Sequence, residues 1–311
     1  MLGICTQGNL DWVVVGQGSN LLVSDDGFKG VVMALGRDFK QCFYDAERHH
    51  FVVGCAVRLS RVVQEALKGR LSGLEFAVGT PGTLGGAVRM NAGSRDEWLG
   101  AQVVSVTTCS PTEGLKHYRQ SDIVWEYRHS SIPADEVIVE CVLHVQPGNV
   151  DAIRGKMETL LARRKENQPL RHPSCGSVFR NPEGKSAGAL IEGVGLKGLM
   201  EGGAQISDMH ANFIINKDNA RALPRLRVGL RLSELEVELR LPPERGGLSV
   251  VSACRKRIRA DRKVPRGDLS GRNRATTLKD EDITHHQLRC VPFVLGISPR
   301  RAQRYVPKKT T

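Results

Sequence analysis

Gly73 to Gly93 reads GLEFAVGTPGTLGGAVRMNAG, and this stretch decides how the rest of the chain is interpreted. It contains six glycines and one proline, and it carries no charge between Glu75 and Arg89. Glycine at such density costs backbone entropy unless the missing side chains serve a purpose. The usual purpose is a backbone that approaches a flat or phosphorylated ligand closely, with its N–H groups turned toward it. The stretch therefore indicates a cofactor-binding loop, because a tight turn accounts for only one or two of its glycines.

The composition is that of a soluble globular protein whose charge is concentrated at one end. The 311 residues suffice for two domains, and contents of 40% hydrophobic and 25% charged residues are ordinary. Of the net charge of +12, residues 246–311 hold +11, because they contain 16 Lys and Arg against 5 Asp and Glu. The eight cysteines form no CxxC pair, which argues against a zinc site or a disulfide framework. With no signal peptide and no apolar run of membrane-spanning length, we expect a cytoplasmic protein.

Short strands with few helices predict an α+β fold rather than an alternating parallel sheet. The turn signal Ser24-Asp25-Asp26-Gly27 separates the first two strands. Runs rich in β-branched and aromatic residues predict strands over Trp12–Val15, Gly30–Leu35, Phe51–Val57, Gln102–Cys109, Glu136–Val145 and Phe213–Asn216.

Two helices are predicted from apolar residues at helical spacing. The first runs from Ser60, a candidate cap, to Gly69, which ends it. The second follows Pro147-Gly148-Asn149 and stops at Pro169. Its Arg163-Arg164-Lys165 run is expected to lie on a solvated surface.

The segment WVVVGQGSNLL places Gly16 and Gly18 directly after a strand. A dinucleotide fingerprint of the Rossmann type would need a third glycine and a following helix, and neither is present. The loop and the Ser19 hydroxyl could still hold a pyrophosphate through backbone N–H groups. A tight strand turn explains the loop equally well.

Two further segments carry candidate polar residues. Tyr127-Arg128-His129-Ser130 lies between predicted strands, and by itself its arginine reads as a surface charge. Ser177 follows a glycine in the loop that Pro182 closes, where a serine could cap a turn or donate a proton. An acyl-transfer hydrolase is disfavoured because the GxSxG motif is absent.

Six segments occur in the order found in the UDP-N-acetylenolpyruvoylglucosamine reductase family, which the chain resembles over roughly residues 12–222. They are GQGSNLLVSDDGFKGVV, GLEFAVGTPGTLGGAVRMNAG, YRHSSI, GSVFRNP, SAGALIEGVGLKGL and GGAQISDMHANFIIN. Six ordered motifs make a chance match implausible.

The resemblance implies a two-part FAD-binding domain of the vanillyl-alcohol-oxidase (PCMH) type and a smaller α+β substrate-binding domain. We expect the FAD-binding domain over residues 1–147, with a truncated first subdomain at 1–57 and a second at 58–147. The substrate-binding domain would cover 148–245, and 246–311 would form a basic tail. The residues implied to contact FAD are Gly16, Gly18, Ser19 and Asn20 at the pyrophosphate, and Gly79, Thr80, Pro81, Gly82, Gly85, Gly86, Asn91, Ala92 and Gly93 at the flavin.

The implied reaction reduces UDP-N-acetylglucosamine enolpyruvate to UDP-N-acetylmuramate, a peptidoglycan precursor, with hydride passing from NADPH through FAD. Cell-wall biogenesis, cell shape and cell division would depend on it. Hydride addition to the enolpyruvyl group builds negative charge on its carboxylate, so a cation and a proton donor are needed. By motif match Arg128 resembles the cation and Ser177 the donor. Glu236 resembles a third catalytic residue, with Glu234 and Glu238 as rivals.

The two ends depart from the family. A segment that precedes Trp12–Val15 in the family is missing, and so is an amphipathic helix before the Glu236-Val237 pair. Either the enzyme is divergent, with a late start and a new basic tail, or the reading frame is wrong at both ends. The change to arginine-rich text near residue 222 favours the frame change slightly.

Two other functions remain open at this point. One is a different FAD-dependent oxidoreductase on the same fold, but YRHS and GSVFRNP together count against it. The other is nucleic-acid binding through the basic tail, whose cations would bind phosphates non-specifically. Because that tail has only Phe293 and Tyr305 for base stacking, we expect no specific nucleic-acid partner and no membrane partner.

Overall fold

The computed structural model describes residues 1–94 and 96–221. Glu236 and its rivals Glu234 and Glu238, together with the basic tail, lie outside the described residues.

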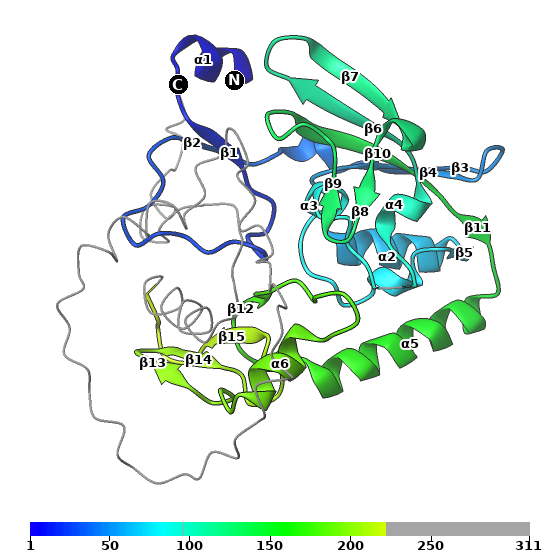
Figure 1. Cartoon of the computed structure of the whole chain (residues 1–311). Helices are drawn as coiled ribbons and strands as arrows, with labels where there is room; N and C mark the ends of the chain where they lie inside the picture. Colours follow the sequence, from blue (N-terminus) through cyan, green and yellow to red (C-terminus); the bar gives the residue numbers. More distant parts are fainter. Residues whose placement is uncertain (95, 222–311) are drawn as a thin grey trace, which may run out of the picture.

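An antiparallel five-stranded sheet is the centre of the larger part of the molecule (Figure 1). The strands in spatial order are β3 (Cys42–Asp45), β4 (His50–Gly54), β10 (Val137–His144), β6 (Val103–Ser110) and β7 (Gly114–Arg119). β10 lies in the middle, and its sequence VIVECVLH buries alternate residues over its second half. Such alternation is typical of a strand with one face against a core.

Three helices cover one face of this sheet (Figure 1): α2 (Leu59–Lys68), α3 (Leu84–Arg89) and α4 (Leu99–Gln102). α3 contacts both β4 and β10. Fully buried side chains from the helices and strands share one core, among them Val53, Val62, Leu84, Val88 and Leu143. The glycine-rich stretch, which supplies α3, is therefore part of the central core.

A separate pair of parallel strands begins the chain. α1 (Leu2–Gln7) precedes β1 (Trp12–Val14), which pairs with β2 (Val31–Met33). The turn predicted between them is confirmed, because the N–H of Gly27 donates to the carbonyl of Ser24 at 2.9 Å.

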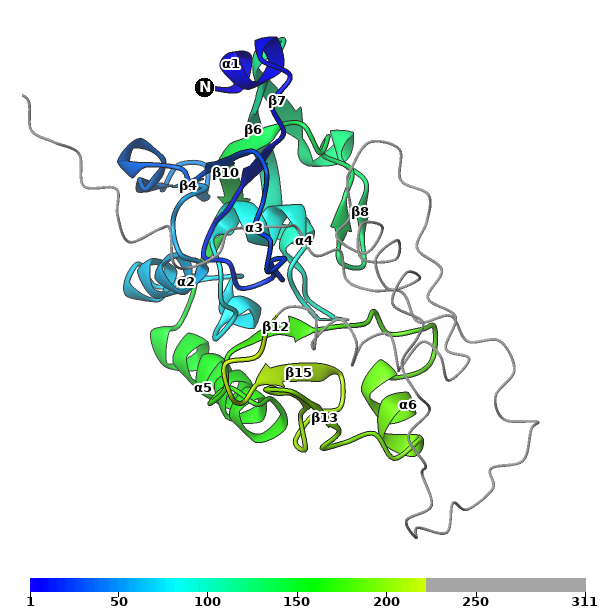
Figure 2. The same cartoon turned by 90° about the vertical axis from the view of Figure 1, so that its left-hand side faces the viewer.

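The long helix α5 (Val150–Asn167) leads from the larger part to a second, smaller sheet (Figure 2). Asn149 caps it, since Oδ1 accepts hydrogen bonds from the N–H groups of Asp151 and Ala152. The second sheet has the order β12 (Ser174–Ser177), β15 (Phe213–Asn216), β14 (Ala204–Ile206) and β13 (Met200–Glu201). With α6 (Ala187–Gly193) it encloses its own core around Phe179, Ile191 and Ile206.

The remaining elements are short. They are η1 (Arg37–Phe39), β5 (Leu71–Ser72), η2 (Glu75–Ala77), η3 (Gln120–Asp122), β8 (Trp125–Glu126), β9 (His129–Ser130) and β11 (Gln146–Pro147).

The predicted strands and helices are confirmed in place, with several boundaries shifted. The expected Ser60 cap is wrong: the helix already begins at Leu59, with Arg58 at the capping position. The N–H of Leu59 donates to the carbonyl of Gly82, so a tertiary contact sets this end rather than a local cap. The glycine-rich stretch is also not a loop throughout. Thr83 caps the short helix α3 by accepting from the N–H of Gly86.

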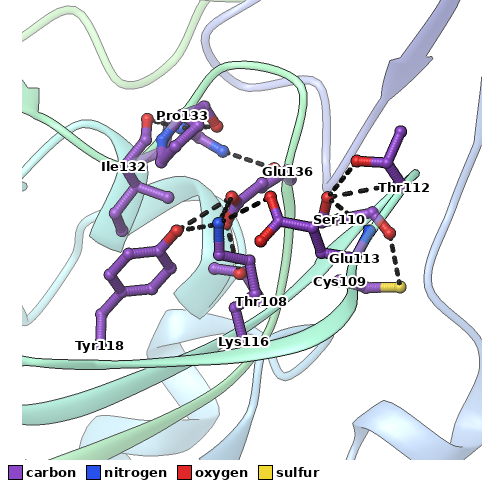
Figure 3. A network of polar contacts seen from close by, with 11 residues as sticks. Thr108, Cys109, Ser110, Thr112, Glu113, Lys116, Tyr118, Ile132, Pro133 and Glu136 are labelled. Carbon is purple, nitrogen blue, oxygen red and sulfur yellow. Dashed lines mark hydrogen bonds and ion pairs between the residues drawn. The ribbon is translucent and has the colours of Figure 1, made fainter.

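A buried carboxylate fastens the edge strand β7 to the sheet (Figure 3). Glu136, just before β10, accepts hydrogen bonds from Thr108 Oγ1 at 2.5 Å and Tyr118 OH at 2.9 Å. Lys116 Nζ pairs with it at 3.2 Å. Burial raises the pKa of Glu136, but the hydrogen bonds from Thr108, Tyr118 and Lys116 outweigh burial, and the net pKa is lowered.

Replacing this carboxylate should make stability less dependent on pH. Because the folded-state pKa of Glu136 lies below the unfolded value, its contribution is present above the ordinary carboxyl range and is lost as the pH falls. Urea unfolding should show Glu136→Gln less stable than the wild type by about 1–2 kcal/mol at pH 7. The difference should shrink toward about pH 4. A difference that stays constant between these pH values would contradict the account.

Candidate active site

Two glycine-containing loops that are far apart in the sequence lie against each other. The N–H of Gly82 donates to Gln17 Oε1 at 3.1 Å. Gly82 has φ +107°, and a Cβ there would lie 3.0 Å from Ser19 Oγ. On the other side, a Cβ on Gly16 would lie 2.5 Å from Thr83 Oγ1. Glycine at both positions favours this close approach, which brings the loop after β1 and the glycine-rich stretch together.

The loop after β1 offers free backbone donors. Gly18 has φ +71°, which turns the chain sharply. Within the part of the chain that the structure describes, nothing accepts a hydrogen bond from the N–H groups of Gln17, Gly18 or Ser19. Successive unpaired N–H groups in a turn form an anion-binding concavity. Gly18 and Ser19 are among the residues predicted to hold the FAD pyrophosphate, and that contact stays a prediction.

Close packing explains some of the other glycines predicted to contact the flavin, and those flavin contacts stay predictions. A Cβ on Gly85 would meet Cys55 at 3.1 Å, so this glycine lets α3 pack against the residue that follows β4. A Cβ on Gly93 would collide with the backbone of Glu97 and Trp98, so glycine allows the chain to pack closely there. A Cβ on Gly86 would meet Thr83 Oγ1 at 3.7 Å, an ordinary contact, so packing against the described residues does not require glycine there.

Asn91 and Ala92 hold the end of the glycine-rich stretch in place. The buried Asn91 side chain donates from Nδ2 to the Glu126 carbonyl and accepts at Oδ1 from the N–H of Gly100, both at 2.9 Å. Ala92 bonds through its backbone to Ala87 and Leu99. Asn91 therefore ties the stretch to β8.

Arg128 lies at the turn of the β8–β9 hairpin, with φ +59°. Its Nη1 donates to the Gly93 carbonyl at 2.8 Å, which brings the YRHS segment to the end of the glycine-rich stretch. The half-buried Arg89 of α3 anchors the chain after β9 by donating to the Pro133 and Glu136 carbonyls. The hairpin that carries Arg128 is thus held at both sides.

Ser177 ends β12, where it lies opposite Phe213 of β15. Three residues further on, Arg180 Nη2 donates to the Arg128 carbonyl at 3.2 Å. Two residues earlier, Cys175 Sγ donates to the Leu21 carbonyl in the loop after β1. The structure therefore brings the GSVFRNP segment to the predicted cofactor loops and to Arg128.

Arg164 belongs to the same site, and its expected place on a solvated surface is wrong. Its side chain is half-buried, and Nη2 donates to Thr80 Oγ1 at 2.8 Å. Arg164 follows Leu160 by four positions and Met157 by seven, so it continues the apolar stripe of α5. That spacing is the signal that could have identified it.

The described residues show neither a metal-binding cluster nor a disulfide bond. They contain no group of three or more His, Cys, Asp or Glu that could hold a metal ion, and six cysteines there are free. No helix between residues 1 and 221 is both long and apolar enough to cross a membrane.

Two known families match the chain: FAD binding domain over residues 1–114, and UDP-N-acetylenolpyruvoylglucosamine reductase, C-terminal domain, over residues 168–229. The UDP-N-acetylenolpyruvoylglucosamine reductase of Heliobacterium modesticaldum is 44% identical over 220 residues, which cover 70% of this chain and 69% of that protein. The protein of the same name from Clostridium novyi is 40% identical over 223 residues, covering 71% and 72%.

A solved structure agrees with these relatives. The crystal structure of UDP-N-acetylenolpyruvylglucosamine reductase (MurB) from Thermus caldophilus superposes with a TM-score of 0.67 at 35% identity, covering 74% of this chain and 84% of that one. The expected α+β fold with an FAD-binding domain of the PCMH type is confirmed. The domain boundaries stay predictions. The chain belongs to the UDP-N-acetylenolpyruvoylglucosamine reductase family.

Proposed function

We propose that this chain is an FAD-dependent oxidoreductase that uses NADPH to reduce UDP-N-acetylglucosamine enolpyruvate to UDP-N-acetylmuramate. Family membership supports this reaction. The observation that carries it is a chain of two hydrogen bonds, from Arg180 to the Arg128 carbonyl and from Arg128 to the Gly93 carbonyl. These bonds connect the GSVFRNP segment, the YRHS segment and the end of the glycine-rich stretch, which would supply the proton donor, the cation and the flavin-binding residues. In the cell the product would serve peptidoglycan synthesis in the cytoplasm, and through it cell shape and division.

Two segments of the chain, the loop after β1 and the glycine-rich stretch, would hold FAD. The N–H groups of Gln17, Gly18 and Ser19 would bind the pyrophosphate, and residues 79–93 would line the flavin. FAD, when bound, carries the hydride between NADPH and the substrate. The contact between Gly82 and Gln17 fixes the distance between the two binding surfaces.

Arg128 would stabilise the charge that develops on the substrate. Addition of hydride to the enolpyruvyl double bond leaves an enolate-like carboxylate, and a fixed guanidinium nearby lowers the energy of that state. Nη1 of Arg128 donates to the Gly93 carbonyl, and the other N–H groups of the guanidinium, which have no acceptor among residues 1–94 and 96–221, would bind the carboxylate.

Ser177 would deliver the proton to the carbon next to the new C–H bond. It is half-buried at the end of β12, and Gly176 before it has φ +79°. A positioned donor of this kind contributes about 10²–10⁴-fold to a rate. Glu236, with Glu234 and Glu238 as rivals, is proposed as the third catalytic residue on the family resemblance alone.

Separate measurement of the two half-reactions tests this function. Stopped-flow spectroscopy of the FAD-loaded protein should show bleaching by NADPH and reoxidation on addition of UDP-N-acetylglucosamine enolpyruvate. Ser177→Ala should keep the bleaching rate and slow reoxidation at least about 100-fold. Ser60→Ala, at an exposed serine of α2, should behave as the wild type. Equal loss of both half-reactions in Ser177→Ala would assign Ser177 a structural role, and a protein that FAD cannot reconstitute would refute the function.

The hydrogen bond from Arg180 to the Arg128 carbonyl predicts a second effect on the half-reaction with the enolpyruvyl substrate. Without its hydrogen bond to the Arg128 carbonyl, the hairpin that carries Arg128 is less firmly placed, and a displacement of about 1 Å costs on the order of 100-fold in rate. Arg180→Gln should therefore lower kcat/KM for the enolpyruvyl substrate by roughly 10- to 100-fold, while flavin reduction by NADPH is unchanged. Arg171→Gln, at an exposed position, is the control. Wild-type kcat/KM in Arg180→Gln would show that the contact does not position Arg128.

A further inference from the structure

The hydroxyl of Ser177 is not held by any side chain that the structure describes. Among residues 1–94 and 96–221, Ser177 Oγ has no hydrogen-bond partner, and Gly176 before it has φ +79°. The register of β12 against β15 shifts between Ser174 and Ser177, so the strand pairing constrains the serine only at its pair with Phe213. The position of the hydroxyl therefore depends on how the backbone of residues 178–180 is held.

The side chain of Asn212 holds that backbone. It is buried, its Oδ1 accepts from the N–H of Phe179 at 2.9 Å, and its Nδ2 donates to the carbonyl of Phe179 at 2.8 Å. The backbone carbonyl of Asn212 also accepts from the N–H of Val178 at 2.9 Å. An amide side chain has both a donor and an acceptor, so it can replace a strand neighbour. Asn212 thus continues the pairing of β12 with β15 past Ser177.

His210 holds Asn212 in turn. Its Nδ1 accepts from the N–H of Asn212 at 3.1 Å, which requires that this ring nitrogen carries no proton. Burial lowers the pKa of His210, which favours the neutral ring. A Cβ on Gly188 of α6 would lie 3.0 Å from His210 Cε1, and the ring centroid lies 4.9 Å from that of Phe213. Packing between α6 and β15 therefore fixes the imidazole.

We propose that Asn212 and His210 are positioning residues for the reduction of the enolpyruvyl substrate. Asn212 fixes the backbone that joins Ser177 to Arg180, and His210 fixes Asn212. The role rests on the proposed function, in which Ser177 delivers the proton and Arg180 steadies the hairpin of Arg128. A displacement of about 1 Å at a reacting group costs on the order of 100-fold in rate, so loss of the clamp should be visible in the kinetics.

Four variants of the full chain test this role. Asn212→Ala removes both side-chain hydrogen bonds to Phe179. Its control, Asn167→Ala, removes the bond from an exposed asparagine side chain to the Arg163 carbonyl. His210→Ala removes the acceptor for the N–H of Asn212, whereas His210→Asn keeps one, because an asparagine Oδ1 can accept from the N–H two residues on.

Two kinds of measurement are made on each variant and the wild type. Stopped-flow spectroscopy of the FAD-loaded protein gives the rates of bleaching by NADPH and of reoxidation by UDP-N-acetylglucosamine enolpyruvate. Hydrogen–deuterium exchange of the apoprotein gives the protection of the N–H groups of Val178 and Phe179. Circular dichroism confirms folding.

Asn212→Ala should slow reoxidation by about 10- to 100-fold, leave bleaching unchanged and speed exchange at residues 178 and 179. His210→Ala should slow reoxidation in the same selective way, His210→Asn should recover part of that loss, and Asn167→Ala should match the wild type.

Wild-type reoxidation in a folded Asn212→Ala protein would overturn the proposal, as would equal slowing of bleaching and reoxidation. If Asn212→Ala does not fold, the two His210 variants decide, and equal reoxidation rates in them would overturn it. If the wild type fails to turn over the enolpyruvyl substrate, the proposed function falls. The exchange measurements then still decide whether Asn212 and His210 hold the segment, and wild-type protection in the folded Asn212→Ala and His210→Ala proteins would show that they do not.

Discussion

The approach of the loop after β1 to the glycine-rich stretch is the constraint on which the rest of the site depends. A Cβ on Gly16 would overlap the Thr83 side chain, and Gly82 has a φ of +107° that other residues rarely adopt, so glycine at both positions favours the close approach of the two backbones. The contact brings the N–H groups of Gln17, Gly18 and Ser19, which have no acceptor among the described residues, beside the stretch that leads into α3. Because α3 itself packs on β4 and β10, the position of this surface is fixed by the central core.

Arginines connect this surface to the rest of the molecule. Arg128 reaches it from the β8–β9 hairpin, Arg164 from α5 and Arg180 from the loop after β12. Each bonds to a backbone carbonyl or a hydroxyl, which orients the guanidinium without neutralising it. Positive charge thus gathers where the substrate and cofactors proposed here would bring phosphates and a carboxylate. The Arg180 contact also links the loop after β12 to the β8–β9 hairpin.

Much of this arrangement could be predicted from the sequence, and the exceptions have physical causes. Local patterns located the strands, the turn at Gly27 and the start of α5 after Asn149, because each depends on neighbouring residues. The start of α2 was missed since it is set by the tertiary bond from Leu59 to Gly82. The short helix α3 was missed because its two glycines disfavour a helix, and packing on Cys55 overrides that preference. Arg164 and Arg180 were missed because their partners, Thr80 and Arg128, lie far away in the chain.

Hydrogen–deuterium exchange with and without FAD tests the central claim that the two loops form one flavin-binding surface. We predict that FAD slows exchange of the backbone N–H groups in residues 16–20 and 79–93 together, at the same FAD concentration. Protection confined to one of these segments, or found only elsewhere in the chain, would contradict the account.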